Sequence, residues 1–207
     1  MVRWRRILLA LVVCGCLPVI TVMMIIVHEV GHSVVARVLG DGRATFILYS
    51  GHCIGCNLYD SQRLSPMANV AVSLGGVLFT ALATVAALGA LCWSRRPPWL
   101  PRWLLIEVAA VCFVGDFLWQ IAQAARLPVP AREPVGWGLG YTDLNAAVSF
   151  FSQATGWSHA AAAAIGITLA MLYTAAVAAL AYQARRLGRR SGSAVGSHRA
   201  VRPKATY

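Results

Sequence analysis

The sequence has few charged residues, and acidic residues are the scarcest: 12% of the 207 residues are charged, and only seven are Asp or Glu. Ordinary soluble domains carry about 25% charged residues, so a soluble globule is not expected. Six cysteines are too few for a small disulfide-rich fold. Apolar residues make up 58% of the chain, which excludes a disordered protein. They fall in long blocks, which is typical of a polytopic membrane protein.

The basic residues outnumber the acidic ones, 18 against seven, and give a net charge of +11. Thirteen of the 18 lie in three short stretches beside apolar blocks, at residues 3–6, 95–102 and 185–204. The positive-inside rule accounts for this distribution. No basic stretch is interleaved with stacking aromatic residues, so we expect no nucleic-acid partner.

Four segments are long enough to cross a hydrocarbon core of about 30 Å. They are residues 7–39, in which Pro18 predicts a kink or break, and residues 67–93, 103–125 and 159–182. Residues 144–156 are too short to span and predict a re-entrant or interfacial helix. Residues 44–49 favour a strand and are followed by glycine turn signals, which predicts a short β-hairpin in an extracytoplasmic connection. The expected fold is therefore an all-α polytopic membrane protein with one small hairpin.

Four crossings return all three basic stretches to the side of the N-terminus. We expect an integral multi-pass protein of the cell (inner) membrane, surrounded by lipid bilayer, with cytoplasmic N- and C-termini. Residues 1–184 are expected to form a single membrane-embedded domain. Residues 185–207 lack apolar periodicity and are expected to form a basic, disordered cytoplasmic tail.

The most informative motif is the H-E-x-x-H sequence from His28 to His32, inside the first apolar block. Spacing of i and i+4 places both imidazoles on one helical face, where they can share one tetrahedral zinc. Glu29 is placed to take a proton from a metal-bound water. The motif also occurs by chance in helices. Inside a membrane span, however, a charged residue costs about 2.5–3.5 kcal/mol, so a metal site is the favoured interpretation.

Zinc needs a third protein ligand, and three other acids lie near the membrane. Asp116 lies inside the third apolar block and could instead be a buried polar contact between helices. Asp143 follows a glycine-rich run and opens a short helix, so it could instead be an N-terminal cap. Glu107 lies closer to the cytoplasmic end and is expected to snorkel or to pair with a basic residue.

On these residues the chain resembles the site-2 protease family of intramembrane zinc metalloproteases. His28 and His32 match the metal-binding histidines of the family, and Glu29 matches the catalytic glutamate. Residues 73–77 occupy the place of a G-P-x-x-N-like motif but lack its Pro and Asn. The family's later Asp-Gly segment corresponds loosely to Asp143, which Leu144 follows here. The resemblance favours Asp143 as third ligand, with Asp116 in reserve, and covers about residues 18–150.

The resemblance implies a zinc metalloendopeptidase that cleaves a membrane protein in or near a transmembrane helix, with Glu29 as general base. A helical substrate must unwind locally before its carbonyls can be attacked. Two other functions stay open. One is a non-catalytic metal-binding scaffold or interaction protein, and the other is a small transporter whose intramembrane acids and histidines relay ions.

The connection between the first two apolar blocks contains the sequence His52-Cys53-Ile54-Gly55-Cys56. A single C-x-x-C pair with one histidine lacks a fourth ligand for a structural zinc. A local disulfide, two plain loop thiols and a functional site all stay open.

Overall fold

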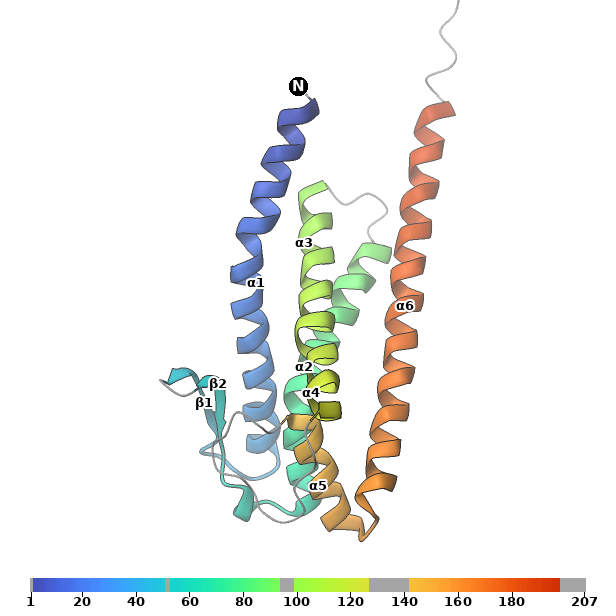
Figure 1. The fold of residues 1–207 in the computed structure, drawn as a ribbon. Coiled ribbons are helices and arrows are strands. Elements are labelled where there is room, and N and C mark those ends of the chain that lie inside the picture. The colour runs from blue at the N-terminus through green and yellow to red at the C-terminus, as the bar shows by residue number, and fades with distance from the viewer. Residues whose placement is uncertain (1, 51–52, 94–98, 127–141, 198–207) are drawn as a thin grey trace, which may run out of the picture.

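The computed structural model describes residues 2–50, 53–93, 99–126 and 142–197. These residues are mostly helical, with one small sheet (Figure 1). In chain order the elements are α1 (Val2–Val38), β1 (Thr45–Ser50), β2 (Cys53–Leu58), the 3-10 helix η1 (Ser61–Arg63), α2 (Pro66–Trp93), α3 (Trp99–Ala110), the π-helical stretch η2 (Val111–Leu118), α4 (Trp119–Arg126), α5 (Asp143–Thr155) and α6 (His159–Ser197). The elements α3, η2 and α4 follow one another without a gap and form one helical path.

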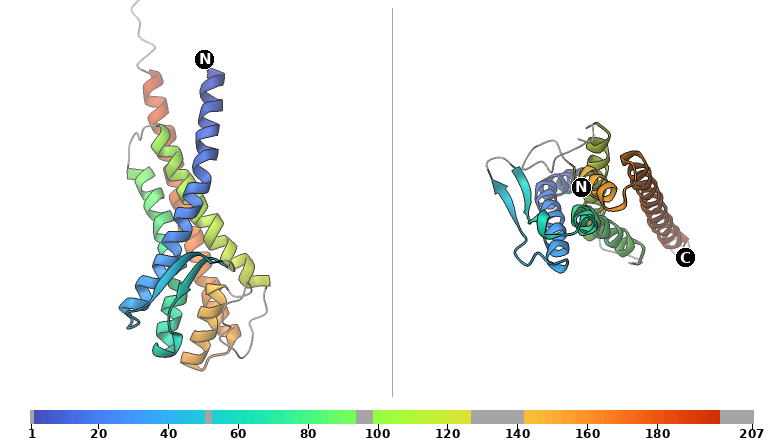
Figure 2. Two further views of the ribbon diagram at one scale, coloured as in Figure 1. Left: turned by 90° about the vertical axis from the view of Figure 1, so that its left-hand side faces the viewer. Right: turned by 90° about the horizontal axis from the view of Figure 1, so that it is seen from below.

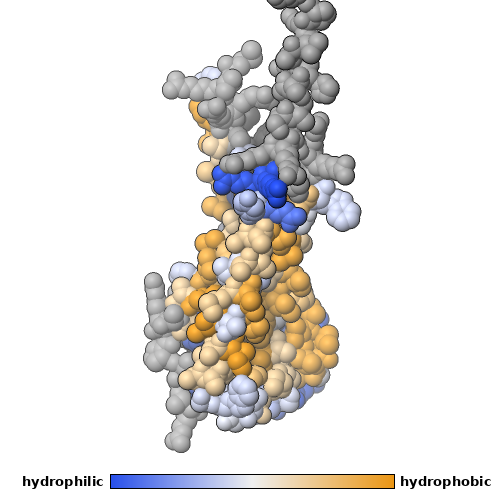
Figure 3. All heavy atoms as spheres, turned by 90° about the vertical axis from the view of Figure 1, so that its right-hand side faces the viewer, coloured by the Kyte–Doolittle hydropathy of each residue, from blue (hydrophilic) through white to orange (hydrophobic). Residues whose placement is uncertain are grey.

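Four helical segments are long and apolar enough to cross a membrane: Ala10–Val38, Pro66–Trp93, Pro101–Ala122 and His159–Arg186. They coincide with the four predicted apolar blocks to within a few residues. Figure 3 shows the face formed by α6, where apolar side chains cover the surface between more hydrophilic ends. Ile167, Leu169, Met171 and Leu172 of α6 are each about 60% exposed. Such an outward apolar surface suits a membrane protein.

The first helix differs from the expected one at Pro18. The helix α1 runs from Val2 to Val38 with Pro18 inside it, so the chain does not break there, and the kink stays a prediction. Proline removes one backbone hydrogen bond, but an apolar segment that must satisfy its other backbone groups internally stays helical around it.

The last helix also differs from expectation. The helix α6 continues to Ser197, past residue 184 where the membrane-embedded domain was expected to end, and residues 198–207 lie outside the described part of the chain. Adding a residue to an existing helix costs far less than nucleating one, so a long span can carry its helix into a polar sequence.

The helix α2 lies at the centre and contacts α1, α3, α5 and α6 (Figure 2). Its Val72, Thr80 and Thr84 are the largest fully buried side chains among the described residues. The predicted hairpin is confirmed, because β1 and β2 pair antiparallel, with Thr45 opposite Leu58 and Ser50 opposite Cys53. The predicted short helix is confirmed as α5, which packs on α2.

The start of α1, the start of α3 and the end of α6 lie at one end of the bundle, whereas the hairpin and α5 lie at the other (Figure 1). The helix ends that adjoin the three basic stretches of the sequence are therefore gathered at one end. This arrangement is expected for four membrane crossings, because an even number of crossings brings both ends of the chain to the same side.

The structure contradicts the prediction that Glu107 on α3 snorkels or pairs with a basic residue. Its residue surface is only 8% exposed, and neither carboxylate oxygen has a hydrogen-bond partner within the described ranges. Because α3 packs against both α1 and α2, the side chain is covered and does not reach the helix end.

Candidate metal centre

The two motif histidines lie on the inner face of α1, one turn apart. His28 is 8% exposed and His32 is 5% exposed, so both imidazoles are shielded from the surroundings. Their Nε2 atoms are 3.0 Å apart. The i, i+4 spacing therefore brings the two nitrogens together as predicted.

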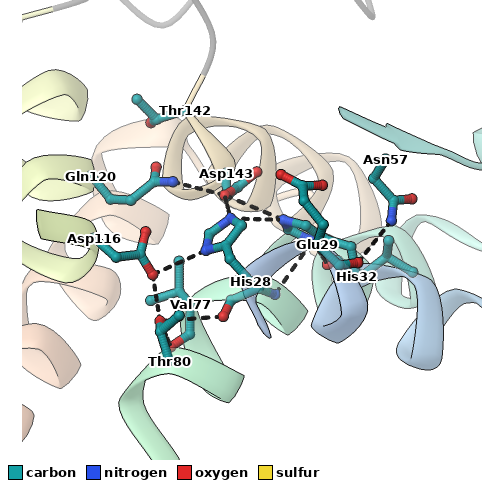
Figure 4. Close-up of polar contacts among 12 residues, drawn as sticks. His28, Glu29, His32, Asn57, Val77, Thr80, Asp116, Gln120, Thr142 and Asp143 are labelled. Carbon is teal, nitrogen blue, oxygen red and sulfur yellow. Dashed lines mark hydrogen bonds and ion pairs between the residues drawn. The ribbon is translucent and has the colours of Figure 1, made fainter. Parts of the chain in front are cut away.

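The helix α5 brings a carboxylate to the same point (Figure 4). The Oδ2 atom of Asp143 lies 2.9 Å from Nε2 of His28 and 3.4 Å from Nε2 of His32. The N-terminal cap of α5 is Thr142, whose hydroxyl accepts the backbone N–H of Asn145 at 3.2 Å. Thr142, and not Asp143, is therefore the N-cap of α5, and the side chain of Asp143 faces the histidines.

The side chains of His28, His32 and Asp143 form a possible metal-binding triad, with their ligand atoms all within 4.8 Å of one another. Two imidazoles and a carboxylate are the ligands of many zinc sites that keep a fourth position for water. Tetrahedral bonds of about 2.0–2.2 Å would separate ligand atoms by about 3.3–3.6 Å. The observed 2.9, 3.0 and 3.4 Å need outward shifts of only a few tenths of an ångström. The residues present therefore fit a zinc ion.

Gly76 on α2 leaves the space that the triad occupies. A Cβ atom at this position would lie 2.5 Å from Nε2 of His28 and 2.5 Å from Nε2 of His32. Contacts under 3.0 Å are not tolerated, so any other residue would displace the two nitrogens. The sequence indicates residues 73–77 as a stretch of interest but gives Gly76 itself no role.

The other ring nitrogens are held by acceptors on the far side of each imidazole. Nδ1 of His32 donates to the backbone carbonyl of Val72 at 2.6 Å, and Nδ1 of His28 donates to Oδ2 of Asp116 at 3.0 Å. A carbonyl and a carboxylate can only accept, so each Nδ1 carries a proton, and each Nε2 is the nitrogen that would be left to bind a metal ion beside Asp143. The structure thus places Asp116 behind His28, while Asp143 belongs to the possible metal-binding triad.

Charge also favours Asp143 as a ligand. Burial alone would raise the pKa of its carboxyl, but the adjacent His32 and His28 outweigh burial and hold that pKa well below its usual range. The group is therefore a carboxylate at neutral pH, which is the form that binds a metal.

The helix α4 supplies a further contact to the triad. The side-chain amide of Gln120 donates to Oδ2 of Asp143 at 2.8 Å, across the gap between α4 and α5 (Figure 4). Thr80, which donates to Asp116, was assigned no role from the sequence. The available signal was that it is a polar residue in an apolar block.

Glu29 lies beside the triad under the hairpin. It is 8% exposed, and Figure 4 draws its carboxylate close to the ring of His32. A Cβ atom on Gly55 would lie 2.7 Å from Oε1 of Glu29, so strand β2 packs directly against this carboxylate. Asn57 of the same strand donates to the backbone carbonyl of Glu29 at 3.2 Å and to Oγ of Ser33 at 2.7 Å.

Two glycines bring α1 and α2 close together at the level of the motif. A Cβ atom on Gly75 would lie 2.8 Å from the carbonyl oxygen of Gly31, and one on Gly31 would meet the carbonyl oxygen of Gly75. The helices therefore touch backbone to backbone, a contact that small residues permit in apolar surroundings. This close approach places His32 against Val72 and Gly76.

The C-x-x-C pair is settled in part. Cys56 is disulfide-bonded and buried, whereas Cys14, Cys16, Cys92 and Cys112 are free. Of the three interpretations of this motif, the disulfide is thus favoured. The side chains of His52 and Cys53 lie outside the described residues.

Searches against protein-family models, curated proteins and solved structures find nothing that matches this chain. The geometry of the site is therefore the basis for its proposed chemistry.

Proposed function

We propose that the chain is an intramembrane zinc metalloprotease that resembles a minimal site-2 protease. One observation carries the proposal: Nε2 of His28, Nε2 of His32 and Oδ2 of Asp143 converge inside a bundle of apolar helices, with Glu29 beside them. Two buried histidines, the buried Glu29 and the half-buried Asp143 are costly among apolar helices, and a shared metal ion offsets that cost.

Within the proposal, His28, His32 and Asp143 hold the zinc ion. Bound zinc supplies a Lewis acid that polarises a substrate carbonyl and lowers the pKa of a bound water to about 7. Glu29 accepts the proton of the attacking water on its carboxylate and delivers it to the leaving amine. Gly55 of the hairpin leaves room for that carboxylate, and Asn57 holds the backbone carbonyl of Glu29.

The position of the motif along α1 indicates where a substrate would be cut. His28 and His32 lie ten and six residues before Val38, the end of the helix. At 1.5 Å per residue, the site lies about 9–15 Å inside the end that carries the hairpin. A transmembrane helix of a membrane-protein substrate, locally unwound near this depth, would expose a carbonyl to the site.

The test compares zinc content and cleavage for the full-length protein in proteoliposomes with single-span model substrates that carry a fluorescent label. Glu29→Gln is expected to keep zinc and lose cleavage, because it removes the proton acceptor and no ligand. His28→Ala is expected to lose both.

The same proteoliposomes distinguish the protease from the two alternative functions. A Glu29→Gln variant that retains cleavage contradicts the proposed mechanism. A wild-type protein that binds zinc but cleaves no substrate favours the metal-binding scaffold. Ion flux across the vesicles that depends on the triad favours the transporter.

A further inference from the structure

We propose that Asp116 is a positioning residue for the metal centre, which holds His28 with its Nε2 atom turned toward the ion. This inference rests on the proposed zinc site and adds to it a role for the third apolar span. It also gives Asp116, the second candidate for the third ligand, a role other than ligation.

Asp116 reaches His28 from behind the ring. Its Oδ2 atom accepts a hydrogen bond from Nδ1 of His28 at 3.0 Å, and the hydroxyl of Thr80 donates to the same oxygen. Asp116 is 5% exposed and Thr80 is fully buried, so water does not compete for these contacts. A carboxylate fixed in this way orients the ring and raises the basicity of the nitrogen that binds the metal.

The two histidines are supported unequally. Behind His32 the acceptor is the neutral backbone carbonyl of Val72, whereas behind His28 it is a carboxylate. A charged acceptor forms the stronger hydrogen bond, so His28 is the better electron donor to the metal. Removing the charge of Asp116 should therefore weaken one ligand and leave the other unchanged.

The third span acts on the triad at two points although it supplies none of the three ligands. Asp116 lies in the π-helical stretch η2 and contacts His28, while Gln120 lies four residues later in α4 and contacts Asp143. π-Helical turns are rare and occur often at functional sites. In this chain the turn lies where Asp116 points at His28.

The test measures the zinc affinity of the full-length protein in detergent by competition with a chromophoric chelator. Asp116→Asn is expected to weaken binding by about 10–100-fold, the usual effect of losing an outer-shell partner. Thr80→Val should weaken it less. Thr84→Val is the matched control, because the buried Thr84 hydroxyl donates to the backbone of Thr80 and is not bonded to the triad; its affinity should change less than about twofold.

Two spectroscopic readouts separate positioning from ligation and from general structural support. The visible spectrum of the cobalt-substituted Asp116→Asn protein should keep the intensity of a tetrahedral site with its full ligand set. Nitrogen NMR of the metal-free protein should show Nδ1 of His28 protonated in the wild type and a lower proton occupancy at Nδ1 in Asp116→Ala.

Several outcomes would overturn the inference. Unchanged zinc affinity in Asp116→Asn would refute it, and so would a cobalt spectrum that shows one ligand lost, because Asp116 would then be a ligand. If the Asp116 variants do not fold, equal zinc affinity in Thr80→Val and Thr84→Val decides against it. A wild-type protein that binds no zinc overturns the proposed function as well, which distinguishes the two failures.

Discussion

At the scale of single residues, Gly76 is the position where one added carbon should matter most. Gly76→Ala is expected to abolish zinc binding, because the new Cβ atom would lie 2.5 Å from both Nε2 atoms. The helix itself should gain, since alanine is about 1 kcal/mol better than glycine inside a helix. Zinc content of the purified variant measures the effect.

The matched control is Gly89→Ala on the same helix, where nothing lies within 4 Å of the added carbon. It should bind zinc like the wild type. Equal zinc content in the two variants would show that the histidine nitrogens do not meet at Gly76.

The residues of the motif itself were predictable, because a helical spacing of i and i+4 decides which side chains share a face. The third ligand was predictable only as one of two acids. Asp143 is 111 residues from His32, and its approach depends on how α5 packs on α2. Thr80 could not be assigned, since its role comes from a contact with a residue 36 positions away.

At the scale of elements, the hairpin is expected to position Glu29. Gly55 has a φ of +73°, which glycine adopts without strain, and its missing side chain makes room for the Glu29 carboxylate. Gly55→Ala should retain zinc and lower cleavage by about 100-fold, the scale of a misplaced catalytic group.

Gly42→Ala, in the loop that precedes the hairpin, is the control for this prediction, because nothing lies within 4 Å of its added carbon. It should cleave at the wild-type rate. Full activity in Gly55→Ala would mean that strand β2 does not hold the glutamate.

The contribution of the loop between α1 and β1 to the stability of the fold is expected to depend on pH through Asp41. Asp41 accepts the backbone N–H groups of Asp60 at 2.8 Å and Arg43 at 3.2 Å, and these bonds hold the pKa of its carboxyl below the usual value. Because the folded pKa is lowered, the stabilising effect is present above the ordinary carboxyl pKa and is lost as pH falls through the folded value.

Asp41→Asn should therefore lower the melting temperature at neutral pH, and the difference from the wild type should shrink in acid. Thermal unfolding in detergent across that pH range measures it. A difference that grows toward acid would contradict the assignment.

The elements follow the sequence where local patterns decide them. Apolar blocks gave four long helices, and β-favouring residues between glycine turns gave the hairpin. Residue types alone did not show how far the helices extend. The helix α1 continues through Pro18 and α6 continues past Arg185, and the π-helical stretch around Asp116 carries no signal in its residue types.

At the scale of the whole molecule, the ends of the chain are expected on one side of the membrane. The first residues of α1 and the last of α6 lie at the same end of the bundle, with the hairpin at the other. The positive-inside rule assigns the end that carries the basic stretches to the cytoplasm.

Reporter fusions at the N-terminus and C-terminus should both report the cytoplasm, and a tag inserted after Gly42 should report the opposite side. Termini on opposite sides would exclude four crossings.

The most direct test of the central claim is the zinc stoichiometry of the purified full-length protein. Wild-type protein is expected to hold one zinc ion per chain, and His28→Ala and Asp143→Ala are expected to hold none. Asp116→Asn should still load at saturating zinc, because its carboxylate lies behind His28 and not at the ion. Wild-type protein without zinc, or Asp143→Ala with a full equivalent, would contradict the account.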